Sequence, residues 1–139
     1  MSEALSPATG QNPVGFVLTN RGSGVCHLHG YPAVAILSKR GGRIPFVTSH
    51  RGDQMVTSER PRLVEIAPHQ SAFLLLNHYR CDLGNVSSGK RLRVSLPHSG
   101  TLSQTLPGSG IAYCGPGDPG SVLAVSPVEP TLRAALAFG

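Results

Sequence analysis

Apolar residues occur in short segments along the chain, and turn-forming residues separate these segments. Residues 71–77 (SAFLLLN) are apolar at successive positions, which is typical of a central strand covered on both faces. Residues 91–96 (RLRVSL) alternate, so Leu92, Val94 and Leu96 are expected to face a core. Further segments of this kind are residues 14–19, 25–29, 33–38, 44–48, 62–66, 101–106 and 121–125. About seven or eight short strands at this spacing predict an all-β fold, a single antiparallel β-sandwich.

The two ends of the chain lack this pattern. Residues 1–13 (MSEALSPATGQNP) have the composition of a flexible lead-in, and residues 129–139 (EPTLRAALAFG) that of a C-terminal tail. Within the tail, residues 132–138 are expected to form one or two helical turns. We therefore expect the β-sandwich domain to span residues 14–128.

Composition narrows the class of protein further. The 139 residues include 17 Gly and 12 Pro but no Trp, and only 14% are charged. Gly and Pro are the two poorest helix formers, which argues against a helical bundle, and a coiled coil needs more charged positions. The longest uninterrupted apolar run has five residues, so no membrane span is expected.

The chain carries a formal net charge of +5, and ten of its twelve basic residues are Arg. Half of the basic residues lie in one stretch: Lys39, Arg40, Arg43, Arg51, Arg60 and Arg62. This stretch is the expected interaction surface for an acidic protein or an envelope polymer, and such binding would weaken with salt. The alternative is that these charges only keep the surface soluble. Phe46 is the one aromatic residue in the stretch that could stack on a base, so a nucleic-acid partner is not expected.

Two histidines provide the candidate metal ligands. On a strand, His27 and His29 point to the same face and make half of a zinc or copper site. A third ligand would have to come from another histidine: His50, His69, His78 or His98. The alternative is two exposed imidazoles, with Cys26 and Leu28 in the core. We expect no cofactor.

The sequence contains no arrangement typical of an enzyme. There is no G-x-S-x-G motif, and the seven carboxylates form no paired set. Cys81 and His78 could form a thiol–imidazole pair, but a disulfide role suits Cys81 better. We expect no catalytic activity.

Residues 17–22 (VLTNRG) and 26–32 (CHLHGYP) resemble the L-T-N-x-G and C-x-L-x-G-Y-P motifs of the actinobacterial family called domain of unknown function 4232. The resemblance continues in the family's order over about residues 10–128. Its later pieces are residues 66–72 (IAPHQSA), Cys81, 92–97 (LRVSLP), Tyr113–Cys114 and 123–125. It implies an immunoglobulin-like sandwich that is secreted or attached to the cell envelope. Because the family has no established biochemical role, the function expected is a non-catalytic binding or structural module.

The chain departs from the family at its start. The family has a further Cys and a strand upstream of the segment at residue 14, and here the thirteen preceding residues contain no Cys. We therefore expect that first strand to be absent. Residues 1–12 also lack the basic and apolar regions of a signal peptide, which leaves a cytoplasmic location open beside the extracellular one.

The signature residues themselves have structural explanations. Asn20 is expected to bond nearby backbone groups at a turn, and Gly30 to adopt a positive φ. Tyr31 is expected to lay its ring on the core and to send its hydroxyl to a backbone group.

The family's cysteine pattern leaves Cys26 without the upstream partner. We therefore expect Cys81 and Cys114 to be bridged in an oxidising compartment, with Cys26 as a buried free thiol. A bridge between Cys26 and Cys81, or three free thiols, are the alternatives.

Overall fold

The computed structural model describes residues 3–7, 13–79, 81, 87–96, 100–106, 108 and 110–137. The strands over these residues are β1 (Glu3–Pro7), β2 (Val14–Asn20), β3 (Cys26–Leu28), β4 (Ala33–Leu37), β5 (Arg43–Ile44), β6 (Val47–Ser49), β7 (Val64–Ile66), β8 (Ser71–Asn77), β9 (Ser87–Gly89), β10 (Arg91–Leu96), β11 (Gly100–Thr105), β12 (Ile111–Tyr113) and β13 (Val122–Val125). A 3-10 helix η1 (Pro119–Ser121) and a short helix α1 (Leu132–Ala135) complete the set. The prediction of an all-β fold is confirmed.

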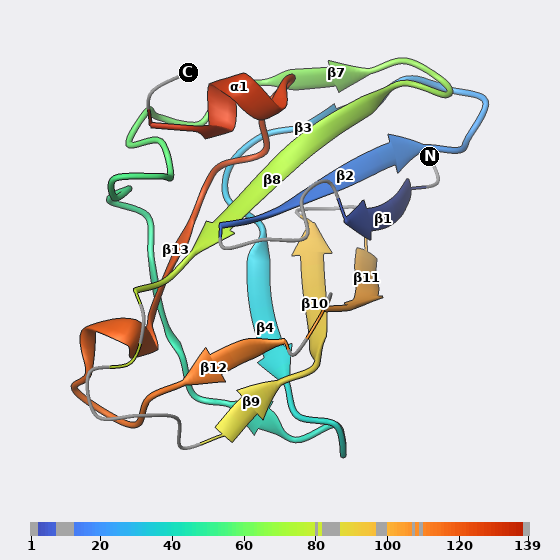
Figure 1. The fold of residues 1–139 in the computed structure, drawn as a ribbon. Coiled ribbons are helices and arrows are strands. Elements are labelled where there is room, and N and C mark those ends of the chain that lie inside the picture. Colours follow the sequence, from blue (N-terminus) through green and yellow to red (C-terminus); the bar gives the residue numbers. More distant parts are fainter. Residues whose placement is uncertain are drawn as a thin grey trace.

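The strands form two main sheets (Figure 1). The first has the order β1-β2-β8-β13-β6, and the second has the order β11-β10-β4-β5. Two small sheets pair β12 with β9 and β3 with β7. The pairings are antiparallel, except that β6 runs parallel to β13. The described strands outnumber the expected seven or eight because several have only two or three residues, too few to show a period.

One apolar core lies between the two main sheets. It joins Phe16 and Leu74 of the first sheet to Ile36 and Leu92 of the second, and all four are almost fully buried. Leu92, Val94 and Leu96 face this core, as their alternation predicts.

The central strand β8 is covered on both faces. Its Leu75 points away from the main core and packs with Val56, Ala124 and Ala135 in a second, smaller cluster. The strand lies in the middle of its sheet, between β2 and β13. Its continuous apolar run follows from this double burial.

Both chain ends contradict the predicted boundaries. Residues Glu3–Pro7 are not a flexible lead-in but strand β1, which pairs antiparallel with β2 in the register Glu3↔Asn20 to Pro7↔Phe16. A strand therefore precedes residue 14, where none was expected. Backbone pairing at a sheet edge does not depend on a hydrophobic pattern, so composition gave no sign of it.

The expected C-terminal tail is likewise part of the domain. The backbone N–H and C=O of Glu129 both bond to Phe73 of β8, at 2.9 and 2.8 Å. Helix α1, which lies inside the expected helical stretch, then packs against β8, and Leu136 bridges to Val56. No helix over the described residues is long and apolar enough to cross a membrane.

Candidate functional site

The signature residue Asn20 is fully buried and joins the turn after β2 to the end of β7 and to the loop that follows β7. Its Nδ2 donates to the carbonyl oxygens of Gly24 and Ile66, both at 2.8 Å, and its Oδ1 accepts from the N–H of Gly22 at 2.9 Å. The backbone carbonyl of Asn20 also accepts from the N–H of His69. The expected role of Asn20 at a turn is confirmed.

Gly30 and Tyr31 follow in the same motif. Gly30 has a φ of 103°, as expected. The Tyr31 hydroxyl donates to the backbone carbonyl of His50 at 3.4 Å, also as expected. Its ring, however, stacks on the His50 ring, with the centroids 3.7 Å apart, rather than entering the core. The expectation for the Tyr31 ring was wrong because His50, which is distant in sequence, places its ring parallel to that of Tyr31.

The candidate metal ligands His27 and His29 are both exposed, while Cys26 and Leu28 are buried. His27 Nε2 lies 3.3 Å from Glu65 Oε1 on the paired strand β7. Of the other histidines, His50 stacks on Tyr31 and His78 bonds to the carbonyl of Tyr79, while His98 lies outside the described residues. Within the described part of the chain, no three His, Cys, Asp or Glu side chains are placed to hold a metal ion.

The six basic residues of the expected interaction surface do not come together. Lys39 and Arg40 lie in the turn from β4 to β5 and Arg43 lies on β5, at the bottom of Figure 1, and all three are exposed. The chain then runs the length of the sandwich, past Arg51. Arg60 and Arg62 lie just before β7, at the top of Figure 1. The first three residues, named here the basic turn, are therefore separate from the last two.

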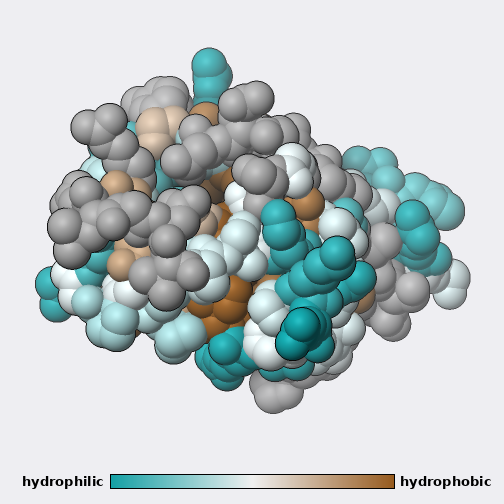
Figure 2. Space-filling view, turned by 60° about the horizontal axis from the view of Figure 1, so that its bottom comes forward, coloured by the Kyte–Doolittle hydropathy of each residue, from teal (hydrophilic) through white to brown (hydrophobic). Residues whose placement is uncertain are grey.

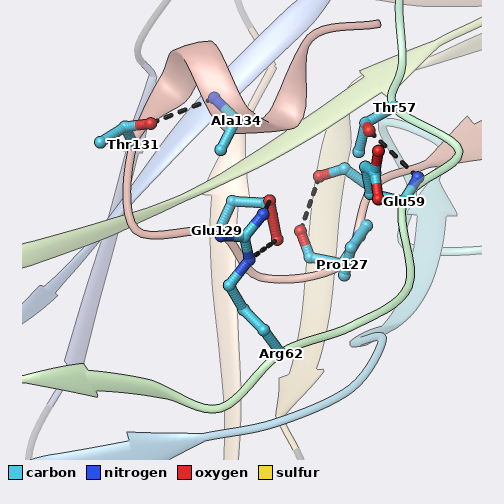
Figure 3. A network of polar contacts seen from close by, with 8 residues as sticks. Thr57, Glu59, Arg62, Pro127, Glu129, Thr131 and Ala134 are labelled. Atoms are coloured by element: carbon cyan, nitrogen blue, oxygen red, sulfur yellow. Dashed lines mark hydrogen bonds and ion pairs between the residues drawn. The ribbon is translucent and has the colours of Figure 1, made fainter. Parts of the chain in front are cut away.

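Arg62 belongs to a different arrangement, the ion pair with Glu129 (Figure 3). Its Nε lies 3.4 Å from Glu129 Oε1, and its Nη2 donates to Glu129 Oε2 at 3.4 Å. The Glu129 carboxylate has no exposed surface, and Oε1 accepts no hydrogen bond from the described residues. Burial raises the pKa of this carboxyl above its usual range; Arg62 opposes the rise and Glu59 adds to it.

The buried carboxylate predicts a pH dependence that Glu129→Gln removes. Because the pKa of Glu129 is higher in the folded protein than in the unfolded chain, its protonation stabilises the fold. This contribution to the free energy of unfolding is complete below the usual pKa of 4.5 and is lost as the pH rises through the raised pKa. The stability of the wild type relative to Glu129→Gln should therefore fall from pH 4.5 upward and then level off. Near pH 7.5 the free energy of unfolding of the variant should equal that of the wild type or exceed it by up to about 1 kcal/mol. The loss of the ion pair costs little because the Arg62 side chain is half exposed, so water can solvate its charge in the variant.

Urea unfolding of both proteins between pH 4 and 8 measures this difference. The exposed residue Gln70 provides the control, because it does not titrate and the difference between Gln70→Ala and the wild type should be the same at all pH values in this range. A difference between wild type and Glu129→Gln that stays constant with pH would contradict the prediction.

A disulfide joins Cys81, which follows β8, to Cys114, which follows β12. The Cα atoms are 5.2 Å apart, and the two residues are 33 positions apart in sequence. This is the pair expected above. Cys26 is buried, 1% exposed, and is not part of this disulfide.

Directly after Cys114, the chain forms one wall of an apolar pocket of about 400 Å³, named here the proline pocket. Its lining includes Pro45, Val47, Tyr113, Pro116, Pro119 and Val122. Val47 and Val122 are partners in the β6–β13 pairing, and the two residues are 62% and 39% exposed. Hydrophobic side chains in such exposed positions are typical of binding surfaces.

A second pocket lies on the other side of β6. This Tyr31 pocket, of about 340 Å³, is lined by residues that include Tyr31, Pro32, Arg43, Thr48, His50 and Val125. Val47 therefore lines one pocket and Thr48 the other, as neighbouring residues of a strand point to opposite faces. The specific Gly-Tyr-Pro motif thus ends at a pocket.

The end of the molecule that carries β5, β9, β12 and η1 comes forward in Figure 2. Apolar residues are visible there between hydrophilic ones. The sequence indicated only the basic turn at this end. The proline pocket combines residues from two distant segments, 45–47 and 113–122, so no local pattern in the sequence predicts it.

Comparison with protein families matches residues 2–129 to the domain of unknown function (DUF4232). No curated protein and no solved structure shows a significant match to the chain. The family match covers most of the chain, from strand β1 to the Glu129 bridge. The chain therefore belongs to the family of the domain of unknown function DUF4232.

Proposed function

We propose that this protein is a non-catalytic binding module of the cell envelope or the extracellular space, and that it binds an acidic protein partner through the end that carries β6. The observation that carries this proposal is the proline pocket, where Val47 and Val122 stay exposed beside an edge strand. The hydroxyl and the carboxylate among its lining residues are both bonded to the backbone: Ser121 Oγ donates to the carbonyl of Gly115, and Asp118 Oδ1 accepts from the N–H of Gly120. Its lining suits the binding of apolar side chains rather than acid–base chemistry.

The charges near the pocket support an acidic partner. The basic turn follows β4, and Arg43 lines the Tyr31 pocket next to β6. Arg51 lies two residues after β6 and is exposed. Complementary charges of this kind accelerate association and set the orientation of the partner.

The disulfide supports a location outside the reducing cytosol. Structural disulfides form and persist in oxidising compartments such as the extracellular space. The Cys81–Cys114 bridge connects two strand ends of the domain and belongs to its framework.

A peptide selection tests the proposed function. Displayed twelve-residue peptides are selected on the immobilised protein, and the enriched peptides are synthesised and measured by fluorescence polarisation. We expect acidic sequences with an apolar residue, and an affinity that falls at least tenfold in Val47→Asp and in Arg43→Glu. The affinity should also fall several-fold when NaCl is raised from 50 to 300 mM.

Two exposed residues away from this end provide matched controls. Val25→Asp and Arg133→Glu introduce the same changes of charge and should bind the peptides like the wild type. Peptides that bind Val47→Asp and Arg43→Glu as tightly as the wild type would refute the proposed surface.

The alternative function is metal binding through His27 and His29, which are both exposed, His27 on β3 and His29 directly after it. It predicts a rise in melting temperature with zinc or copper, because a ligand that binds only the native state stabilises it. The rise would have to disappear in His27→Ala. An unchanged melting temperature with both metals would leave the binding module as the proposal.

A further inference from the structure

We infer that the partner binds as an extended segment that adds a strand to the free edge of β6, with apolar side chains in the proline pocket and acidic side chains toward Arg43 in the Tyr31 pocket. This inference rests on the proposed function, because it specifies how that same surface would be occupied. It commits to a segment of another protein, and a second copy of this chain is one outcome of the test.

β6 lies at one edge of its sheet. β6 is the last strand of the order β1-β2-β8-β13-β6, and within the described residues no strand pairs with its other edge. An edge strand of this kind presents backbone N–H and C=O groups to solvent and can template the pairing of a further chain. Val47 and Thr48 of β6 are both exposed, so the side chains along this edge are accessible.

Each of the two pockets is lined by one residue of β6. Val47 lines the proline pocket and Thr48 the Tyr31 pocket, so the two pockets lie on opposite faces of the same edge. A strand added to β6 would have the same alternation, with every second side chain directed to each face. In strand addition, backbone hydrogen bonds supply affinity, and pockets for alternate side chains supply specificity.

The two pockets differ in the chemistry of their lining residues. The proline pocket is lined by three prolines and two exposed valines, and suits an apolar side chain. The Tyr31 pocket is lined by the basic residue Arg43 together with Thr48 and the stacked rings of Tyr31 and His50, and suits a carboxylate. Arg can hold a carboxylate through two parallel hydrogen bonds. An alternation of apolar and acidic residues is the sequence pattern that satisfies both faces at once.

The test uses a synthetic peptide of eight alternating Glu and Val residues, blocked at both ends and kept at concentrations where it is monomeric. In an extended chain, the N–H groups of its Val residues point to one edge and those of its Glu residues to the other. Two derivatives are therefore made, one N-methylated at the Val residues and one at the Glu residues. We expect one derivative to bind at least tenfold more weakly than the parent, and the other to stay within about threefold, since only one edge faces β6.

Hydrogen exchange followed by NMR gives the second measurement. The parent peptide should slow the exchange of at least one backbone amide of Val47, Thr48 or Ser49, and the weakened derivative should not. A scrambled peptide, with its Val residues in one block and its Glu residues in another, should bind at least tenfold more weakly than the parent.

The outcomes separate this inference from the proposed function. If the parent peptide loses affinity in Val47→Asp and Arg43→Glu but both methylated derivatives bind alike, the surface stands and strand addition is wrong. If the parent peptide binds these two variants like the wild type, the surface itself is wrong. Sedimentation velocity of the protein alone decides the occupant: a dimer that Val47→Asp dissociates would replace the acidic segment by a second copy of the chain.

Discussion

Replacing Cys81 and Cys114 together by Ala is expected to lower the free energy of unfolding by about 3 to 4 kcal/mol. The two residues are 33 positions apart, and in the chain-entropy model a cross-link of this loop length removes about that much entropy cost from folding. The closed segment contains β9 to β12, and the bridge joins the end of β12 to the segment that follows β8. Changing both residues avoids leaving an unpaired thiol at the site.

Urea unfolding with and without a reductant measures the effect and provides its own control. The wild type should lose stability when it is reduced, whereas Cys81→Ala/Cys114→Ala should not respond. Because the wall of the proline pocket that runs from Pro116 to Val122 begins two residues after Cys114, reduction should also weaken peptide binding there. Equal unfolding midpoints for the oxidised wild type and the double variant would show that the bridge contributes no stability.

The strands that were predicted correctly are those in which the pattern of apolar and polar residues matches the burial of each side chain. Alternation in β10 placed Leu92, Val94 and Leu96 in the core, and the unbroken apolar run of β8 indicated cover on both faces. Alternation in β3 placed Cys26 and Leu28 inward and His27 outward. In each case, the burial of every side chain depends on its own position along one strand, so the pattern can be predicted from a short stretch of sequence.

The elements that were missed are held by contacts that leave no local pattern. β1 is held by backbone pairing with β2, and the Glu129 segment by two backbone hydrogen bonds to Phe73. The burial of Glu129 itself runs against the usual exposure of carboxylates and could not be expected from the sequence.

The candidate site was only partly predictable for the same reason. The sequence located the basic turn, since charge can be counted directly. The proline pocket forms where Pro45 and Val47 meet Tyr113 and the segment that ends at Val122, and this meeting depends on the parallel pairing of β6 with β13. Parallel neighbours are distant in sequence, so the surface appears only once the topology is known.

Asn20→Asp is expected to lower the free energy of unfolding by about 3 kcal/mol or more at pH 7. The substitution keeps the size and shape of the side chain but replaces the Nδ2 donor by an oxygen, which then faces the carbonyl oxygens of Gly24 and Ile66 at the 2.8 Å of the present hydrogen bonds. A buried, fully desolvated carboxylate opposite two carbonyl oxygens loses two hydrogen bonds and gains repulsion. The loss should shrink as pH falls, because a protonated Asp side chain can donate again.

Asn20→Ala separates loss of hydrogen bonds from repulsion. It removes the same donor and the acceptor for Gly22 without adding a charge, so we expect a smaller loss of about 2 kcal/mol that does not change with pH. Urea unfolding at pH 5 and pH 7 measures both variants. A loss in Asn20→Asp no greater than that in Asn20→Ala at pH 7 would contradict the donor role of Nδ2. The ordering expected here would assign Asn20 of the Leu-Thr-Asn motif a role in stability, because its side chain joins the turn after β2 to the end of β7.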